Sequence, residues 1–286
     1  MSELADKQIT IVGLGLMGGS LAGALRGKCR TVVGVARRAA SVEMALEREL
    51  IDRGTTDLAE GVSQADIAVL ATPVRVILRQ IPEIGPLLPD GCMLMDMGST
   101  KADIVAAMAD LPPHIQPLGG HPMCGKETSG LEVAEPTLYQ GRTFILSPLP
   151  RTSEAALAQG KALAQAAGAR PLVIEAARQD FLVATISHLP YLLACALVST
   201  ADATTSADPL VWEIVAGGFR DTSRVAGSNV TMMVDILLTN HDQVVKATEV
   251  CISQLRELQS LVAEKNEEAL RAMLSAIRET RKEMYP

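Results

Sequence analysis

The sequence predicts an α/β domain followed by an all-helical domain, because the pattern of its apolar residues changes near residue 176. Before that point, short apolar runs alternate with helical stretches, which is typical of βαβ units around a parallel sheet. After it, long helical periodicities take over, including Val234–Leu238 and Cys251–Ala276. We therefore expect one domain at residues 1–176 and a second at residues 177–286.

Each element of the first domain follows from its local pattern. Strands are expected at the short apolar runs Gln8–Val12, Arg30–Val35, Ile67–Ala71, Met93–Met97, Arg142–Leu146 and Pro171–Ile174. Helices are expected at Met17–Arg26, Ser41–Glu49 and Glu154–Ala167, the last ending at Gly168. Thr100 and Asp103 have the spacing of a capping box, which predicts Thr100 as the cap of a further helix.

The segment Phe181–Ala201 contains no Asp, Glu, Lys or Arg over 21 residues, which is long enough for a membrane span. However, Ser187, His188 and Pro190 lie near its centre, where polar groups would be costly in hydrocarbon. No cluster of Lys or Arg flanks either end. We therefore expect a helix buried inside protein, for example at a subunit interface, and no membrane partner.

Composition and charge exclude several classes of protein. The net charge of −7 argues against a nucleic-acid partner, because phosphate neutralisation needs a surplus of Lys and Arg. The five cysteines form no CxxC pair, and the first residues lack the basic and apolar regions of a signal peptide. We expect reduced thiols, a cytoplasmic location and no metal site.

A glycine-rich turn, Gly-Leu-Gly-Leu-Met-Gly at residues 13–18, follows the first expected strand. A strand before and a helix after it are the context of a dinucleotide-binding (Rossmann-type) motif. Gly13 would make the tight turn, Gly15 would let the backbone approach the pyrophosphate, and Gly18 would let the helix pack. Leu16 and Met17 complete the expected cofactor contact. The alternative is a glycine-rich turn that binds no ligand.

The end of the second expected strand indicates which dinucleotide binds. An NAD site usually has an acidic residue about 20 residues beyond the glycines, but here Ala36, Arg37 and Arg38 stand in that place. Two guanidinium groups suit a 2′-phosphate, so we favour NADP over NAD. The alternative is that both arginines are solvated surface charges. Thr72 and Pro73, which end the third strand, are also expected at the cofactor.

Two of the four histidines lie in suggestive surroundings. His121 is expected on a glycine-rich loop between strands, where it could take a proton while hydride leaves the same carbon. His188 is expected in mid-helix beside Pro190, whose kink could open a pocket wall. Each could instead be a structural histidine whose hydrogen bonds are satisfied.

Two further groups are candidates for substrate contact. Arg220 and Arg224 lie in a glycine-flanked cluster and could form bidentate pairs with carboxylates. Alternatively, Asp221 pairs with its neighbours and the cluster is only the start of a helix. Ser99, just after the strand Met93–Met97, could orient a reacting hydroxyl, or it could cap a helix.

Five blocks together resemble the prephenate/arogenate dehydrogenase family of tyrosine biosynthesis. They begin at Val12, Asp96, Gly120, Ser187 and Gly218 and read V-G-L-G-L-M-G-G-S-L, D-M-G-S-T-K, G-H-P-M, S-H-L-P and G-F-R-D-T-S-R. The blocks follow the order of the family and span most of the chain. The first block alone would fit many dehydrogenases.

The resemblance implies oxidative decarboxylation of arogenate to tyrosine or of prephenate to 4-hydroxyphenylpyruvate. It implies that His121 is the hydrogen-bond acceptor or base for the C4 hydroxyl of the substrate and that Ser99 supports that hydroxyl. Arg224 would bind a substrate carboxylate, and His188 would help to position the substrate. A dianionic small molecule entering a protein of net charge −7 needs such local cations.

The resemblance also implies a helical second domain that forms a homodimer, with the segment Phe181–Ala201 in the dimer core. Two rivals remain open from the sequence. The first is another two-domain NADP enzyme, of the β-hydroxyacid dehydrogenase or imine reductase type. The hydroxyacid enzymes rely on a lysine in the helical domain, whereas the first lysine here is Lys246, far from any glycine-flanked motif. The second rival is a non-catalytic NADP-sensing protein, against which the set Ser99, His121 and Arg224 argues.

Overall fold

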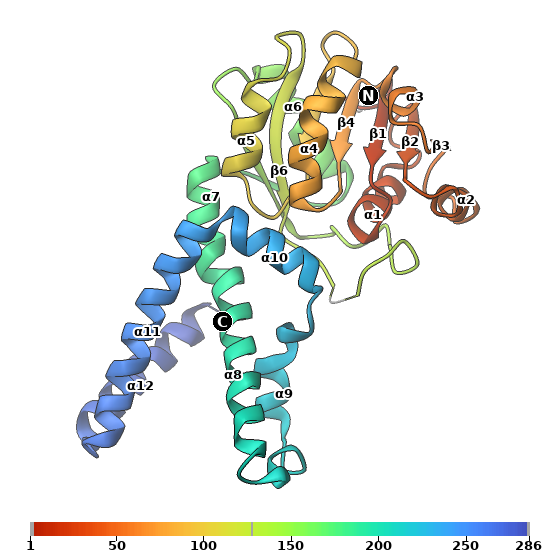
Figure 1. Cartoon of the computed structure of the whole chain (residues 1–286). Coiled ribbons are helices and arrows are strands. Elements are labelled where there is room, and N and C mark those ends of the chain that lie inside the picture. The colour runs from red at the N-terminus through yellow and green to blue at the C-terminus, as the bar shows by residue number, and fades with distance from the viewer. Residues whose placement is uncertain (1–2, 127, 285–286) are drawn as a thin grey trace. The chain divides into compact units, whose positions relative to one another are not determined.

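The computed structural model describes residues 3–126 and 128–284. The chain forms two compact units, residues 1–241 and residues 242–286 (Figure 1). The first unit contains the sheet and the helices that follow it. The second unit contains α12 (Glu267–Met284) and all of α11 (His241–Ala263) except its first residue.

The sheet of the first unit has eight strands in the order β3-β2-β1-β4-β5-β6-β7-β8. The strands are β1 (Gln8–Val12), β2 (Thr31–Val35), β3 (Arg53–Thr55), β4 (Ile67–Leu70), β5 (Met93–Asp96), β6 (Gln116–Pro122), β7 (Thr143–Pro148) and β8 (Arg170–Val173). Every neighbouring pair is parallel except β6 and β7. The predicted α/β class is therefore confirmed, and the order of the strands places the carboxyl ends of β1, β4 and β5 side by side.

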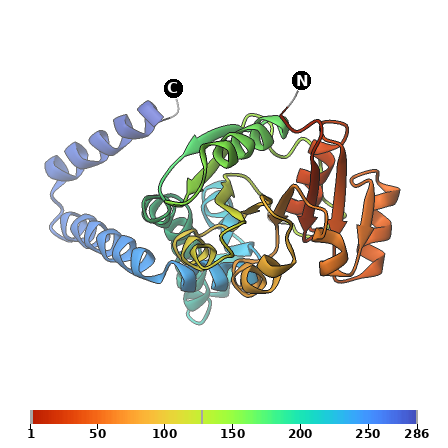
Figure 2. The ribbon, with the colours of Figure 1, turned by 90° about the horizontal axis from the view of Figure 1, so that it is seen from above.

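Helices cover both faces of the sheet, which is why the central strands are continuous apolar runs (Figure 2). One face packs against α1 (Leu16–Leu25), α2 (Ala39–Glu47) and α6 (Glu154–Ala166). The other face packs against α3 (Leu58–Val62), α4 (Val74–Ile84) and α5 (Ala102–Ala109). The helix α4 continues into a 3₁₀ turn, η1 (Gly85–Leu87).

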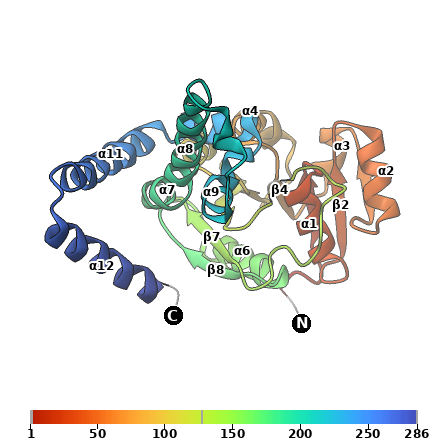
Figure 3. The same ribbon diagram turned by 90° about the horizontal axis from the view of Figure 1, so that it is seen from below.

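Every described element after β8 is helical. These elements are α7 (Ala176–Val183), the π-helical turn η2 (Ala184–His188), α8 (Leu189–Thr205), the 3₁₀ turn η3 (Pro209–Trp212), α9 (Gly217–Ser223), the 3₁₀ turn η4 (Arg224–Gly227) and α10 (Val230–Thr239). The helix α8 packs against η3, α9 and η4 (Figure 3). The helical character of the second half is confirmed, whereas the domain boundary at residue 176 stays a prediction.

The apolar helical stretch Ala176–Thr205 is the one part of the described chain that is long and apolar enough to cross a membrane by length and composition. Core helices of soluble proteins pass the same test. Only 22% of its most apolar window is buried within the single chain, and the side chains of Phe181 and Ile186 are 58% and 65% exposed. The expected burial is therefore incomplete within one copy of the chain.

The prediction that Thr100 caps the following helix is wrong. The carboxylate of Asp180 instead accepts from the backbone N–H groups of Lys101 and Ala102, at 2.7 Å each. The hydroxyl of Thr100 lies 2.8 Å from the hydroxyl of Thr239. Because the cap comes from a residue almost 80 positions away, a local spacing rule does not reveal it.

The prediction that His121 lies on a loop is also wrong, because it belongs to β6. This strand contains two glycines, which argued against a strand in the sequence. Both are required by close packing: a Cβ on Gly120 would overlap the backbone oxygen of Asp96, and one on Gly119 would lie 3.0 Å from that of Ser147.

In two places the structure interrupts a helix that the sequence predicts. The interruption expected near Pro190 is present as the π turn η2, and Pro190, which has no N–H to donate, is the second residue of α8. The periodicity over Cys251–Ala276 predicts one helix, and this is wrong. Lys265 has φ +53°, which ends α11, and the side chain of Asn266 accepts from the N–H of Ala269 at the start of α12.

Candidate active site

The glycine turn between β1 and α1 leaves open the space that a dinucleotide needs. Gly13 has φ +106°, and a Cβ there would lie 2.8 Å from Thr72 Cγ2, so only glycine fits. A Cβ on Gly18 would overlap the backbone oxygen of Gly13, so this glycine lets α1 pack on the turn. At Gly15, by contrast, no atom of the described residues outside its two chain neighbours lies within 4 Å of an added Cβ. A phosphate group can therefore approach the backbone at Gly15.

The start of α1 supplies donors at the same place. The N-cap of this helix is Gly15, and no side chain caps its first N–H groups. Such N–H groups and the positive end of the helix dipole favour a phosphate. Gly15, Leu16 and Met17 therefore fit the pyrophosphate of a dinucleotide, and the predicted geometry of the turn is present.

The predicted ribose site lies at the carboxyl end of β2. The backbone N–H of Ala36 donates to the oxygen of Thr55, which fixes the start of this loop. The side chains of Arg37 and Arg38 are exposed, and neither forms an ion pair with any residue that the structure describes. Both guanidinium groups are therefore available to an anion.

A cavity of about 720 Å³ lies beyond the carboxyl ends of β1, β4 and β5. The predicted residues that line it are Gly15, Leu16, Met17, Thr72, Pro73, Ser99 and His121. The helical part of the same unit closes it with Ile186, Ser187, Pro190, Tyr191, Val225, Asn229 and Met233 among others. The structure thus brings the glycine turn, Ser99 and His121 to one cavity.

Two predicted substrate residues do not line this cavity directly. His188 is buried, at 1% exposure, although its neighbours Ser187 and Pro190 line the cavity. Arg224 is an exposed residue at the start of η4, and its neighbour Val225 lines the cavity. Both therefore lie next to the cavity wall rather than in it.

One buried carboxylate, that of Asp96, holds the segments that carry Ser99 and His121. Its Oδ2 accepts from the N–H of Gly98 at 2.7 Å, and its Oδ1 accepts from the N–H of Gly120 at 3.0 Å. Each of these glycines precedes a predicted catalytic residue. The loop after β5 and the strand β6 are thus tied together at the residues next to Ser99 and His121.

The ammonium group of Lys101 forms an ion pair with this carboxylate, and both side chains have 0% exposure. Burial raises the pKa of Asp96 and lowers the pKa of Lys101, whereas the attraction between the two groups opposes both shifts. A buried carboxylate with two backbone donors and a cation is fully partnered. The pair therefore supports the two segments that carry Ser99 and His121.

His121 has a ring that is neutral at physiological pH. Burial, followed by the positive charges of Lys101 and of a protonated His188, lowers its pKa to about 3. Its Nδ1 is buried and lacks a hydrogen-bond partner among the described residues. A neutral imidazole keeps a lone pair on one nitrogen, so a ring that lines the cavity can accept a hydrogen bond from a ligand there.

A seam of polar contacts joins α5, α7 and α10 behind this site. Asp180 caps α5, the side chain of Gln179 donates to the backbone oxygen of Ser99 at 3.4 Å, and Asn240 contacts both Asp180 and His188. Burial raises the pKa of Asp180. The sequence reasoning missed this seam. The signal that could have found it is Asp180, a carboxylate at the very edge of the uncharged segment.

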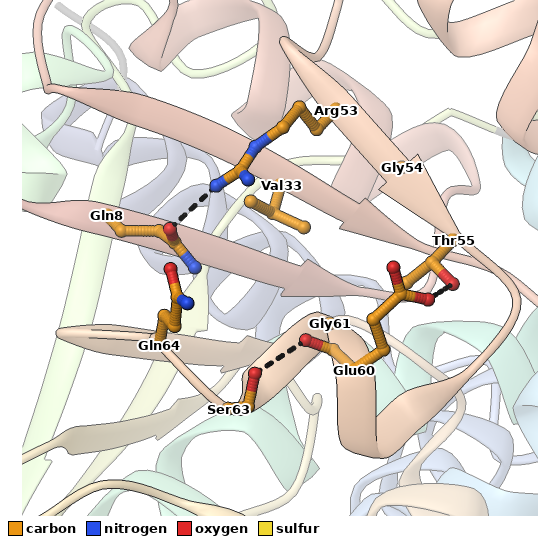
Figure 4. Close-up of a pocket in the computed structure, with 9 residues that line it drawn as sticks. All are labelled: Gln8, Val33, Arg53, Gly54, Thr55, Glu60, Gly61, Ser63 and Gln64. Atoms are coloured by element: carbon orange, nitrogen blue, oxygen red, sulfur yellow. Dashed lines mark hydrogen bonds between the residues drawn. The ribbon is translucent and has the colours of Figure 1, made fainter.

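A second, smaller cavity of about 210 Å³ lies along β1, β2 and β3 under α3 (Figure 4). Arg53 points across the strands and donates to the side-chain oxygen of Gln8 at 3.0 Å. On the other side of this cavity, the hydroxyl of Thr55 donates to Glu60 at 2.5 Å. Two pairs of its polar side chains, Arg53 with Gln8 and Thr55 with Glu60, thus bond to each other, and no predicted site residue lines it.

Comparison with known proteins agrees with this arrangement. Residues 21–173 match the nucleotide-binding domain of prephenate dehydrogenase, and residues 175–276 match its dimerization domain. The chain belongs to the prephenate dehydrogenase family. The first match begins after the glycine turn, so the assignment of that turn depends on its own geometry.

Relatives of the prephenate dehydrogenase family match nearly the whole chain. The prephenate dehydrogenase of Bacillus subtilis is 31% identical over 94% of this chain and 74% of its own length. The prephenate dehydrogenase from A. aeolicus, solved with hydroxyphenyl propionate and NAD+, has a TM-score of 0.92 at 30% identity, over 99% of both chains. The arogenate dehydrogenase of Synechocystis has a TM-score of 0.85 at 30% identity, over 97% of this chain and 99% of its own. Family membership decides against the two rival enzyme families.

Proposed function

We propose that this chain is an NAD(P)-dependent dehydrogenase that oxidatively decarboxylates prephenate or arogenate. The observation that carries the proposal is the common support of Ser99 and His121 by Asp96, at the cavity that the glycine turn also lines. Membership of the family and the names of the relatives support the same reaction. The product would be 4-hydroxyphenylpyruvate from prephenate and tyrosine from arogenate.

The reaction removes a hydride from C4 of the cyclohexadienyl ring and releases the C1 carboxylate as CO₂. The electron pair left by CO₂ completes the aromatic ring, and the C4 oxygen ends as the phenol of the product. A bound pyridine nucleotide supplies the hydride acceptor. Because aromatisation makes the step strongly downhill, the main task of the protein is alignment.

His121 and Ser99 have separate roles in this alignment. His121 accepts a hydrogen bond from the C4 hydroxyl, which increases electron density on that oxygen as the hydride leaves. Its pKa of about 3 favours this acceptor role over full removal of the proton. Ser99 orients the same hydroxyl, because it lies on the loop that Asp96 ties to the strand of His121.

The substrate carboxylates need cations in an acidic protein. Arg224 is proposed to bind one carboxylate by a charge-assisted hydrogen bond, and His188 to help position the substrate. Their positions next to the cavity-lining residues Val225 and Ser187 support this assignment.

For the cofactor we propose NADP in preference to NAD. The exposed Arg37 and Arg38, with no acidic residue between them and the end of β2, support contact with a 2′-phosphate. The turn and the family support a pyridine nucleotide in general. A preference for NADP also favours arogenate as the better substrate, by analogy with NADP-linked relatives.

We propose in addition that the protein is a homodimer in the cytoplasm. The exposed apolar side chains of α7, η2 and α8, and the match to a dimerization domain, support the dimer. All five cysteines are free thiols, which suits a reducing compartment. Analytical ultracentrifugation of the purified protein tests the dimer.

The experiment that tests the function is an absorbance assay of reduced nicotinamide with each substrate and each cofactor. We expect turnover with prephenate or arogenate and a higher kcat/KM with NADP than with NAD. If neither substrate gives reduced nicotinamide, the proposed activity is contradicted and the alternative of a non-catalytic NADP-binding protein is favoured. A clearly higher kcat/KM with NAD would contradict the cofactor assignment alone.

A further inference from the structure

The side chain of Asn240 lies between the backbone oxygen of Asp180 and the ring of His188. Its side-chain Nδ2 lies 2.8 Å from the backbone oxygen of Asp180 and 3.3 Å from Nδ1 of His188. The three residues are almost fully buried, at 6% exposure for Asn240, 2% for Asp180 and 1% for His188. Solvent therefore does not compete for these contacts.

The contact with Asp180 orients the amide group of Asn240. A backbone carbonyl oxygen only accepts hydrogen bonds, so the amide must turn its NH₂ group, and not its oxygen, toward Asp180. The ambiguity between the nitrogen and oxygen of an amide side chain is thus resolved by chemistry at this residue. The same nitrogen faces His188.

The orientation of Asn240 then decides where the His188 ring carries its proton. The NH₂ group has a second N–H, which can only be satisfied if Nδ1 of His188 offers a lone pair. The ring is neutral, because burial lowers its pKa to about 4. A neutral ring without a proton on Nδ1 carries it on Nε2. Among the described residues, Asn240 is the only hydrogen-bond partner of this ring.

We propose that Asn240 is a positioning residue that holds His188 in its Nε2–H tautomer, so that the ring presents a donor to a substrate carboxylate. Only the identity of the acceptor rests on the proposed function. The location supports the assignment, since Ser187 and Pro190 on either side of His188 line the cavity. His188 also lies near enough to His121 for its charge to lower the pKa of that residue.

The fold holds Asn240 in place from two sides. It lies between the end of α10 and the start of α11, and the preceding residue, Thr239, bonds to Thr100. The carbonyl that orients its amide belongs to Asp180, whose carboxylate caps α5. The tautomer of His188 is therefore linked to the packing of the helical region on the sheet domain.

The direct test is nitrogen NMR of the full-length protein labelled with ¹⁵N-histidine at neutral pH. The protein contains four histidines, so His188→Gln assigns the signals by their loss. We expect Nδ1 of His188 to resonate in the range of an unprotonated ring nitrogen and Nε2 in that of a protonated one. The opposite pattern in the wild-type protein overturns the proposal, whatever the variants show.

Variants of Asn240 test whether this residue causes the tautomer. Asn240→Asp replaces the donor with an acceptor, so we expect a proton on Nδ1 and a KM about tenfold higher, the size of one lost hydrogen bond to a charged group, with a smaller change in kcat. Asn240→Ala removes the constraint, so we expect averaged signals. The matched control is Thr248→Val, which removes a hydroxyl bond within α11 and should leave the His188 signals unchanged.

The outcomes separate this proposal from the proposed function. If Asn240→Ala leaves the His188 signals and KM as in the wild type, Asn240 is not a positioning residue. If the tautomer depends on Asn240 but neither prephenate nor arogenate is oxidised, the tautomer assignment stands and the proposed function fails. Should Asn240→Asp not fold, the wild-type spectrum and Asn240→Ala still decide.

Discussion

At the scale of single residues, the surroundings of each polar group decide its chemistry. His121 lies in an ordinary strand, yet burial, Lys101 and His188 lower its pKa to about 3, and its Nδ1 lacks a partner among the described residues. A ring in this state accepts hydrogen bonds and seldom carries charge. Arg224, by contrast, is exposed, and its guanidinium group suits the attraction of an anionic substrate.

Replacement of His121 tests the acceptor role. His121→Asn should lower kcat by about 10²–10⁴-fold, the usual contribution of a positioned proton acceptor. The affinity for the dinucleotide, measured by titration, should change little, because the pyrophosphate is proposed to bind at the glycine turn and not at His121. A kcat within a few-fold of the wild type would contradict the role assigned to this ring.

Replacement of Arg224 tests the carboxylate contact. Arg224→Ala should mainly raise KM, because it removes a charge-assisted contact of about 1.5–3 kcal/mol. Steady-state kinetics with prephenate and arogenate measure the effect. The matched control is Arg30→Ala, an exposed arginine before β2 that pairs with Asp66, and it should keep KM. An unchanged KM in Arg224→Ala shows that the carboxylate binds elsewhere.

At the scale of elements, the ends of β1 and β5 do more than connect strands to helices. The turn after β1 keeps open space over Gly15 and forbids a side chain at Gly13 and Gly18. The end of β5 carries Asp96, which bonds to its own loop and to β6 at the same time. Two strand ends thus set the positions of the proposed cofactor contact and of both predicted catalytic residues.

Gly15→Ala should weaken dinucleotide binding while it leaves the stability of the fold nearly unchanged. Gly15 has φ −106°, which alanine accepts, and an added Cβ meets no atom, so the free energy of unfolding should change by less than about 1 kcal/mol. Dinucleotide binding should weaken by about 1–3 kcal/mol, the range for a methyl group forced into occupied space. Denaturation and titration measure the two effects.

The control for this prediction is Gly217→Ala, another glycine whose added Cβ has open space. It should preserve both folding and dinucleotide affinity. If Gly15→Ala binds NADP and NAD as tightly as the wild type, the pyrophosphate does not lie over this turn.

Asp96→Asn should destabilise the protein and misplace the site. It leaves the buried Lys101 ammonium without a counter-charge, so the free energy of unfolding should fall by about 3–5 kcal/mol, measured by denaturation. The double variant Asp96→Asn/Lys101→Met removes the unpaired charge and should regain much of this stability. Its kcat should stay low, because Gly98 and Gly120 no longer share an anionic acceptor. A double variant with both stability and kcat restored would show that Asp96 does not position Ser99 and His121.

At the scale of the whole molecule, buried neutral histidines link folding to pH. His121 and His188 have pKa values of about 3 and about 4 when folded, whereas an unfolded histidine has a pKa near 6.5. The unfolded chain therefore binds more protons below pH ~6.5. The stability due to these groups is complete above that pH and is lost as the pH falls through the folded values.

The thermal midpoint should accordingly decrease as the pH is lowered from about 6.5 toward 4. His188→Gln should make this decrease shallower, because one of the two groups is gone, whereas His114→Gln, in an exposed loop, should not. The difference between the two slopes isolates His188 from the carboxyl groups that titrate in the same range. Equal slopes in all three proteins would contradict the neutral, buried state of His188.

The exposed apolar surface of α7, η2 and α8 concerns the assembly of the whole molecule. Phe181 and Leu193 remain exposed in one copy, so the stability of the isolated chain does not explain their apolar character. A second copy would bury them, which is why the homodimer is proposed. In a dimer, the measured stability would depend on protein concentration as well as on pH.

Local patterns in the sequence were sufficient for the fold class, the glycine turn and the family, because each depends on residues that are neighbours in the chain. Strand periodicity, the spacing of Gly13, Gly15 and Gly18, and the five sequence blocks are all of this kind. The tertiary structure alone decided which groups support the site. Asp180 caps a helix that begins 78 positions earlier, and Asn240 meets His188 across 52 positions. Buried polar groups take whichever partner the packing brings to them, so the cap at Thr100, the loop at His121 and the role of Asn240 could not be read from spacing.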